Sequence, residues 1–164
     1  IITRELFEKV VFQFGKVIYA VLRRQIDAHR EIDQLLEQSQ DNAKSDNLNN
    51  LIDLNPDARQ YFFAKTDEKW FDWLWKNGFL DIIKGEAEDA SSRGNGMPEL
   101  QYLARIAEKI PIKIVDFMLE VSVSDKTFNP AIVDRFLWIC RSLSADQLAR
   151  MAEKIRSENW IPLM

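Results

Sequence analysis

The apolar residues of this chain recur mainly at intervals of three and four, the spacing that places side chains on one face of an α-helix. The first such pattern covers residues 3–40. On a helix drawn at about 100° per residue, its apolar positions share one arc and its polar positions share the other. The apolar arc holds Phe7, Val10, Val11, Phe14, Val17, Ile18, Val21, Leu22, Ile32, Leu35 and Leu36, and the opposite arc holds Lys9, Gln13, Lys16 and Arg23. The pattern predicts a long N-terminal amphipathic helix, assigned to residues 1–40.

Two interpretations of this helix stay open. Its apolar stripe can pack on its own domain or on a neighbour, as such stripes usually do. Alternatively, the helix can lie on a membrane surface. A coiled coil is disfavoured, because His29 and Asp33 would occupy the seam beyond Ile26. The apolar run over residues 10–22 is too short to cross a bilayer, so we expect no transmembrane segment.

A polar stretch, "SQDNAKSDNLNN", comes after this helix. It lacks apolar periodicity and is rich in Asn, Asp and Ser, so we expect a linker over residues 41–50. Beyond it, Asn55 can cap a helix that begins at Pro56, Thr66 can cap the next helix, and Gly78 can end that helix. Further helices are predicted over residues 98–110, 111–121, 129–143 and 144–156.

The later helices recur with a fixed period. Pro98 and Pro130 are 32 residues apart, and the turns at Pro111 and Ser144 are 33 residues apart. Apolar positions repeat at the same offset: Ile106, Ala107, Ile110, Val115 and Met118 align with Ile139, Cys140, Leu143, Leu148 and Met151. Helix pairs that repeat at this period indicate an α-solenoid, in which each pair buries its apolar face against the next. The helical-repeat domain is assigned to residues 51–164.

The segment "PELQYLARIAEKIPIKIVDFMLEV…NPAIVDRFLWICRSLSADQLARMAEKI" resembles HEAT/armadillo-like helical repeats, and more narrowly the repeat regions of large, poorly characterised bacterial proteins. The resemblance covers residues 51–164 and implies stacked helix pairs that form a right-handed superhelix. It also implies a recognition surface on the concave side, lined by the second helix of each pair. Pro162 comes one more period after Pro130. We therefore expect that the repeat domain is truncated at its C-terminal end and that flanking domains belong to the same longer chain.

Composition narrows the class of function. A net charge of −4 and a pI near 5.1 disfavour a nucleic-acid partner, which normally needs a basic surface. The single cysteine, Cys140, excludes an internal disulfide, and a cytoplasmic location is expected. With one histidine, His29, a two-histidine metal site is excluded. No nucleophile or phosphate-binding motif stands out, so we expect neither catalysis nor a cofactor.

Candidate binding residues come from helix faces. Trp138 projects outside the apolar arc of its own helix, and exposed tryptophan is a frequent anchor at protein interfaces. On the second helices of the repeats, the candidate residues are Lys113, Asp116, Glu120, Asp146 and Arg150. Their mixed charge suits a protein or peptide partner better than a phosphate backbone.

The leading hypothesis is a non-catalytic helical-repeat scaffold, or a segment that recognises a protein or peptide, within a larger cytoplasmic protein. The alternative is a regulatory or sensing segment of a multidomain enzyme, an ATPase or nuclease, whose catalytic domain lies outside this chain.

Overall fold

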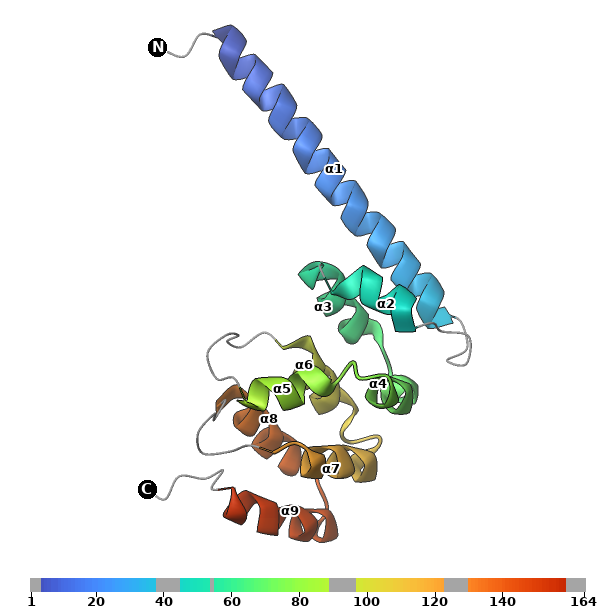
Figure 1. Ribbon diagram of the computed structural model, residues 1–164, viewed down its shortest axis with the longest axis vertical. Coiled ribbons are helices and arrows are strands. Elements are labelled where there is room, and N and C mark those ends of the chain that lie inside the picture. The colour runs from blue at the N-terminus through green and yellow to red at the C-terminus, as the bar shows by residue number, and fades with distance from the viewer. Residues whose placement is uncertain (1–3, 38–44, 54, 89–96, 123–129, 159–164) are drawn as a thin grey trace. The chain divides into compact units, whose positions relative to one another are not determined.

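The computed structural model describes residues 4–37, 45–53, 55–88, 97–122 and 130–158 (Figure 1). Within these ranges the chain is helical and contains no β-strand, so the prediction of an all-α protein is confirmed. The α-helices are α1 (Arg4–Glu37), α2 (Ser45–Ile52), α3 (Pro56–Lys65), α4 (Phe71–Lys76), α5 (Asp81–Glu88), α6 (Pro98–Ile106), α7 (Pro111–Glu120), α8 (Pro130–Cys140) and α9 (Ala145–Ser157). A 3₁₀-helix, η2 (Glu68–Trp70), precedes α4.

The chain forms two compact units, Ile1–Phe62 and Phe63–Met164. The predicted bounds of the first and last segments, residues 1–40 and 51–164, stay predictions.

In the first unit, α2 packs against the C-terminal part of α1. Helix α2 corrects the expectation of a linker over residues 41–50, because Ser45–Ile52 are helical. The cause is the spacing of the few apolar residues: Leu48 and Ile52, four positions apart, are both fully buried. The rest of the expected linker lies outside the described residues.

The contact between α1 and α3 is made by two pairs of residues, each four positions apart on its helix. The His29 ring stacks on the Tyr61 ring at 3.9 Å between centroids. His29 Nε2 lies 3.0 Å from Asp57 Oδ2, and the Tyr61 hydroxyl donates to Asp33 at 2.9 Å. The hydrogen bond to Asp33 raises the pKa of the Tyr61 hydroxyl. Buried Ile32 lies on α1 between His29 and Asp33 in sequence, so polar and apolar contacts are interleaved along this helix.

Local caps set most helix boundaries. The Asn55 Oδ1 accepts a hydrogen bond from the Ala58 amide at 3.1 Å, which confirms the predicted cap of α3. Pro98 and Pro111 begin α6 and α7, as predicted. At the predicted turn, Ser144 caps α9 in a capping box with Gln147.

The prediction that Thr66 caps the next helix is wrong. Thr66 is buried, and the cap is Asp67, whose Oδ1 accepts from the Lys69 amide at 3.1 Å. That cap starts the 3₁₀-helix rather than an α-helix.

Helix α4 ends at Gly78 as predicted. The Gly78 amide donates to Trp75 O at 3.2 Å, and the Phe79 amide donates to Leu74 O at 3.0 Å. This double hydrogen bond is a Schellman motif, and it requires a left-handed residue, which Gly78 supplies with φ 79°. The accompanying apolar contact pairs two buried residues, Leu74 and Phe79, so the turn directs the chain back into the core.

In the second unit, α6 packs on α8 and α7 packs on α9, and Figure 1 shows α7 and α9 side by side. Aligned positions of the repeat are buried together in three cases: Ile106 with Ile139, Ala107 with Cys140, and Met118 with Met151. Leu148 departs from the pattern, because it is 38% exposed. The third proline of the series, Pro162, lies outside the described residues.

The two described glycines outside α5 allow a paired test of backbone conformation. Gly78→Ala should destabilise the second unit by about 1–2 kcal/mol, because an L-residue resists the left-handed conformation and its Cβ would lie 3.1 Å from Asp81 Oδ2. All five tryptophans come after residue 63, so urea unfolding monitored by tryptophan fluorescence reports on this unit.

Gly15→Ala is the matched substitution within a helix. Apart from the adjacent backbone of its own helix, no atom lies within 4 Å of the added Cβ. It should therefore raise the thermal stability of the helical circular-dichroism signal, by about 1 kcal/mol in local helix propensity, and leave the fluorescence midpoint unchanged. An unchanged midpoint in Gly78→Ala would contradict the role assigned to the turn.

Candidate partner-binding surface

The three polar residues predicted on α7 lie within about 60° of one another on the helix. Each is paired with a different helix of the same unit. The Asp116 Oδ1 accepts from Arg150 Nη2 of α9 at 2.6 Å. On the other side, Lys84 Nζ of α5 donates to Glu120 Oε2 at 3.2 Å, and Lys113 Nζ donates to Asp72 of α4. We call this set the α7 ion-pair ladder; its members are Asp72, Lys84, Lys113, Asp116, Glu120 and Arg150.

The α7 ion-pair ladder limits how these residues could bind a partner, which is the role predicted for them. Four of the five charged candidates, Lys113, Asp116, Glu120 and Arg150, are paired within the chain. Because the pairs are exposed to solvent, each contributes at most about 1 kcal/mol to stability. A charged partner would therefore have to displace or extend an existing pair. Sequence reasoning missed Asp72 and Lys84, since their meeting with α7 depends on how α4 and α5 are rotated about their axes.

Asp146, the fifth charged candidate, has a different position. It lies in the first turn of α9, next to the capping box of Ser144 and Gln147. A carboxylate there interacts favourably with the positive end of the helix dipole. Its exposed side chain also adds negative charge at the start of α9, beyond the ladder.

Trp138 stands apart from the other described tryptophans. Its side chain is 50% exposed, and the Arg135 guanidinium lies 5.9 Å from its ring centroid. By contrast, Trp70 is buried and meets Trp73 edge-on at 5.5 Å. Trp75 meets Phe117 edge-on at 5.6 Å. The helical-wheel prediction that Trp138 projects from the apolar arc of α8 agrees with this exposure.

Helix α6 anchors the backbone that leads from α3 into η2. Arg105 Nη2 donates to Phe63 O at 2.7 Å and to Thr66 O at 2.6 Å, and Arg105 Nη1 donates to the Ala64 carbonyl. One helical turn earlier, the buried Tyr102 hydroxyl donates to Asp67 O at 3.0 Å. One turn later, Lys109 Nζ lies 2.9 Å from Glu68 Oε2. Sequence reasoning missed this anchor, because its acceptors are mainly backbone carbonyls.

The surroundings shift the pKa of three groups in this unit. Burial, reinforced by the charge of Asp67, raises the pKa of the Tyr102 hydroxyl far above its ordinary range. The hydrogen bond from Lys109 lowers the pKa of Glu68. Burial raises the pKa of the Cys140 thiol, as is typical of a structural rather than a reactive cysteine.

Metal-binding and membrane-spanning features are both absent from the described residues. Across the ranges that the structure describes, no cluster of three or more His, Cys, Asp or Glu side chains is placed to hold a metal ion. In the same ranges, no helix has the length and apolar character needed to cross a bilayer.

Comparison with known families, curated proteins and solved structures finds no match to this chain. The resemblance to HEAT/armadillo-like repeats therefore stays a prediction, and function has to be inferred from the surfaces described above.

The Arg105 anchor can be tested by substitution. Arg105→Met should destabilise the second unit by about 1.5–3 kcal/mol, because several carbonyls lose a charged donor. Arg105→Lys should recover only part of this loss, since an ammonium group lacks the planar fork of the guanidinium. Arg141→Met, at an exposed arginine after α8, is the control and should change stability by less than about 0.5 kcal/mol. Urea unfolding by tryptophan fluorescence measures all three; equal effects of Arg105→Met and Arg141→Met would refute the anchor.

The pair of Lys109 and Glu68 predicts a pH dependence. Because the folded-state pKa of Glu68 is lowered, the pair stabilises the fold above the ordinary glutamate pKa, and this contribution is lost as the pH falls through the lowered value. Lys109→Met should raise the Glu68 pKa toward its ordinary value, as measured by carbon NMR of the side-chain carboxyl group.

The stability difference between wild type and Lys109→Met should then be largest at neutral pH and shrink on acidification. In a Glu68→Gln background, the same substitution should show no such pH dependence. Persistence of the dependence in that background would assign it to another group.

Proposed function

We propose that the second unit is a helical-repeat recognition segment, an α-solenoid of the HEAT/armadillo type that binds a protein or peptide without catalysis. In this proposal it is preceded by the long amphipathic helix α1 and belongs to a larger cytoplasmic, bacterial protein. The buried Cys140 thiol is compatible with a reducing compartment.

The observation that carries the proposal is the packing of alternate helices. Two successive pairs, α6 with α7 and α8 with α9, are related by the period of 32–33 residues. The first helices of the two pairs pack on each other, and so do the second helices. In a solenoid, each helix packs on the corresponding helix of the next repeat, as these helices do. Solenoids present extended surfaces for recognition.

Two features of the surface favour a protein partner. Trp138 presents an exposed aromatic face beside a guanidinium, a combination that is common at the centres of protein interfaces. The α7 ion-pair ladder presents both signs of charge at close spacing. Mixed charge gives specificity for a complementary polar surface, whereas a phosphate backbone would favour positive charge alone.

The test begins with partner capture on the immobilised full chain. Captured proteins are identified by mass spectrometry, and the affinity of a purified candidate is then measured for each variant. Trp138→Ala should weaken binding by about 30-fold or more, the usual effect at an interface hot spot. The unfolding midpoint should change little, because half of the Trp138 side chain is already in solvent. Phe12→Ala, an exposed aromatic on α1, is the matched control and should bind as wild type does.

The ladder supplies a second pair of variants. Asp116→Arg alone places two cations together and breaks the contact with Arg150. Asp116→Arg combined with Arg150→Asp restores an ion pair in the reversed direction, so the fold should recover. If a partner contacts these charges, the reversed pair should still weaken binding by about tenfold, within the range measured for close charge pairs. Binding that is equal to wild type in both Trp138→Ala and the reversed pair would remove this surface from the proposal.

A further inference from the structure

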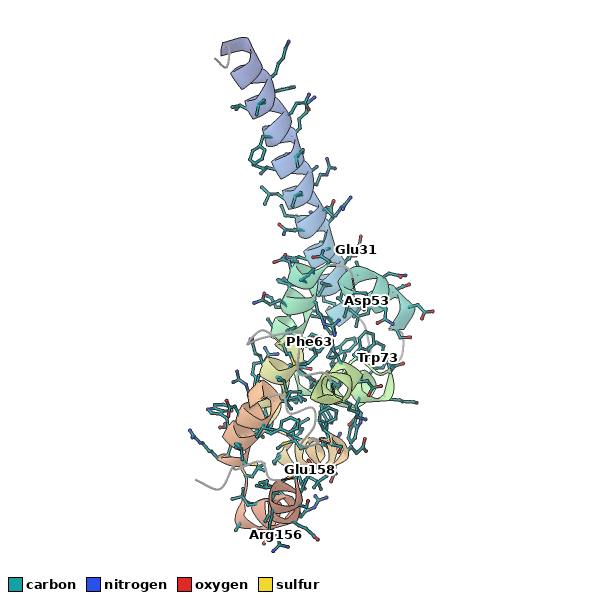
Figure 2. All side chains as sticks on the ribbon, turned by 60° about the vertical axis from the view of Figure 1, so that its left-hand side comes forward. Glu31, Asp53, Phe63, Trp73, Arg156 and Glu158 are labelled. Atoms are coloured by element: carbon teal, nitrogen blue, oxygen red, sulfur yellow. The ribbon has the colours of Figure 1, made fainter. Side chains whose placement is uncertain are left out.

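Helix α1 exposes an extended apolar surface. Residues 9–24 are exposed without interruption. Figure 2 shows side chains projecting on all sides of this part of the helix. Ten large apolar side chains along it are between 45% and 66% exposed: Val10, Val11, Phe12, Phe14, Val17, Ile18, Tyr19, Val21, Leu22 and Ile26. On the helix they span about 220°, an arc that only Gly15 and Gln25 interrupt. We call this surface the α1 apolar arc.

The remaining part of the helix surface carries charge of a single sign. Over residues 9–26 there are four basic residues, Lys9, Lys16, Arg23 and Arg24, and no acidic residue. All four lie within about 100°, in the gap left by the apolar arc. Lys9, Lys16 and Arg23 succeed one another at intervals of seven, so they form a nearly straight line along the helix. Acidic residues begin again at Asp27, whose Oδ2 lies 4.0 Å from Arg23 Nε.

The edge between the two arcs also has the chemistry of a lipid interface. The Lys16 Nζ lies 4.4 Å from the centroid of the Phe12 ring, at the border of the apolar arc. Phe12 and Tyr19 lie seven residues apart on that border. Amphipathic aromatic residues and long basic side chains are enriched where hydrocarbon meets headgroups, because the stem or ring is apolar and the tip is polar.

Two partners could cover the α1 apolar arc: a second copy of α1 or a membrane surface. The sign of the charge on the basic arc and the width of the apolar arc decide between them. If two α1 segments paired through the α1 apolar arc, the four basic residues would lie on the far side of each helix, where the partner helix offers them no carboxylate. The 220° arc covers about two thirds of the helix circumference. A single neighbouring helix would therefore leave much of the arc in water. A helix that lies in a bilayer interface contacts lipid on its buried face and on both sides, so a wide apolar arc can be covered. The anionic headgroups complement the basic arc.

We propose that α1 docks on an anionic membrane surface. The apolar arc lies at the boundary between acyl chains and headgroups, and Lys9, Lys16, Arg23 and Arg24 contact lipid phosphates. The helix lies in the plane of the interface. This surface is separate from Trp138 and the α7 ion-pair ladder, so the proposal does not depend on the proposed recognition function.

Flotation of the full chain with vesicles tests the proposal. Vesicles of phosphatidylcholine with about one third phosphatidylserine should carry the protein, and vesicles of phosphatidylcholine alone should carry much less. Each basic residue near an anionic surface contributes about fivefold in binding. Lys16→Glu with Arg23→Glu and Arg24→Glu should therefore lower binding by on the order of a hundredfold or more. Circular dichroism checks that the variant remains helical.

The matched control is Lys69→Glu with Lys76→Glu and Arg141→Glu, which changes the net charge equally at exposed positions outside α1. It should bind vesicles as wild type does. A second variant, Phe14→Ser with Ile18→Ser, should lose binding through the apolar arc while all basic residues remain.

Several outcomes overturn the proposal. Equal loss in the two charge variants would mean that net charge, not α1, governs binding. Absence of binding by the wild-type chain would assign the apolar arc to a protein neighbour. Light scattering that shows a dimer, converted to a monomer by Phe14→Ser with Ile18→Ser, would assign it to a second copy if vesicle binding is also absent.

Discussion

The hydrogen bonds of the Arg105 guanidinium fix the backbone with which the second unit begins. The last carbonyls of a helix have no partner within it. At the end of α3, Arg105 supplies donors to the carbonyls of Phe63, Ala64 and Thr66. A planar guanidinium carries five N–H donors in a fixed fork, so one side chain can serve all three acceptors. Tyr102 of α6 adds a hydrogen bond to the Asp67 carbonyl, and Lys109, just beyond α6, holds the Glu68 carboxylate, so the segment beyond α3 is fixed at several points.

Fixing this segment determines the course of the chain through η2 and α4. Asp67 starts η2, so Trp70 and Phe71 enter the core one after the other. The Schellman turn at Gly78 then ends α4 after six residues, and the exposed Asp72 in its first turn accepts from Lys113. Of the three pairs in the α7 ion-pair ladder, the pair of Lys113 and Asp72 therefore depends on the position of α4. Exposed pairs contribute little free energy each, but together they favour one rotation of α7 about its axis.

Sequence reasoning succeeded where a structure depends on neighbouring residues. The caps at Asn55 and Ser144, the proline starts of α6 and α7, and the turn at Gly78 all involve partners within five positions. It failed at α2, where two apolar residues sufficed because both are completely buried. Among the candidate site residues, the exposure of Trp138 could be predicted from the helical wheel. The partners of Lys113, Asp116 and Glu120 could not, since each lies 34 or more residues away and depends on packing.

The α7 ion-pair ladder and the surface of α1 differ in how their charges are arranged, and this difference suits them to different kinds of partner. In the α7 ion-pair ladder, each charge lies within hydrogen-bonding distance of its opposite, so the field cancels over a short range and discrimination depends on local geometry. Residues 9–26 of α1 hold four basic residues and no acidic one, so the net charge of this segment is positive and its field extends to about a Debye length. The attraction produced by such a field does not require a partner with a particular arrangement of charges. An anionic lipid surface is such a partner, because its charges have no fixed arrangement. One chain thus carries a surface suited to shape recognition and another suited to a diffuse charged layer, and a substitution in either should leave the other intact because they share no residue.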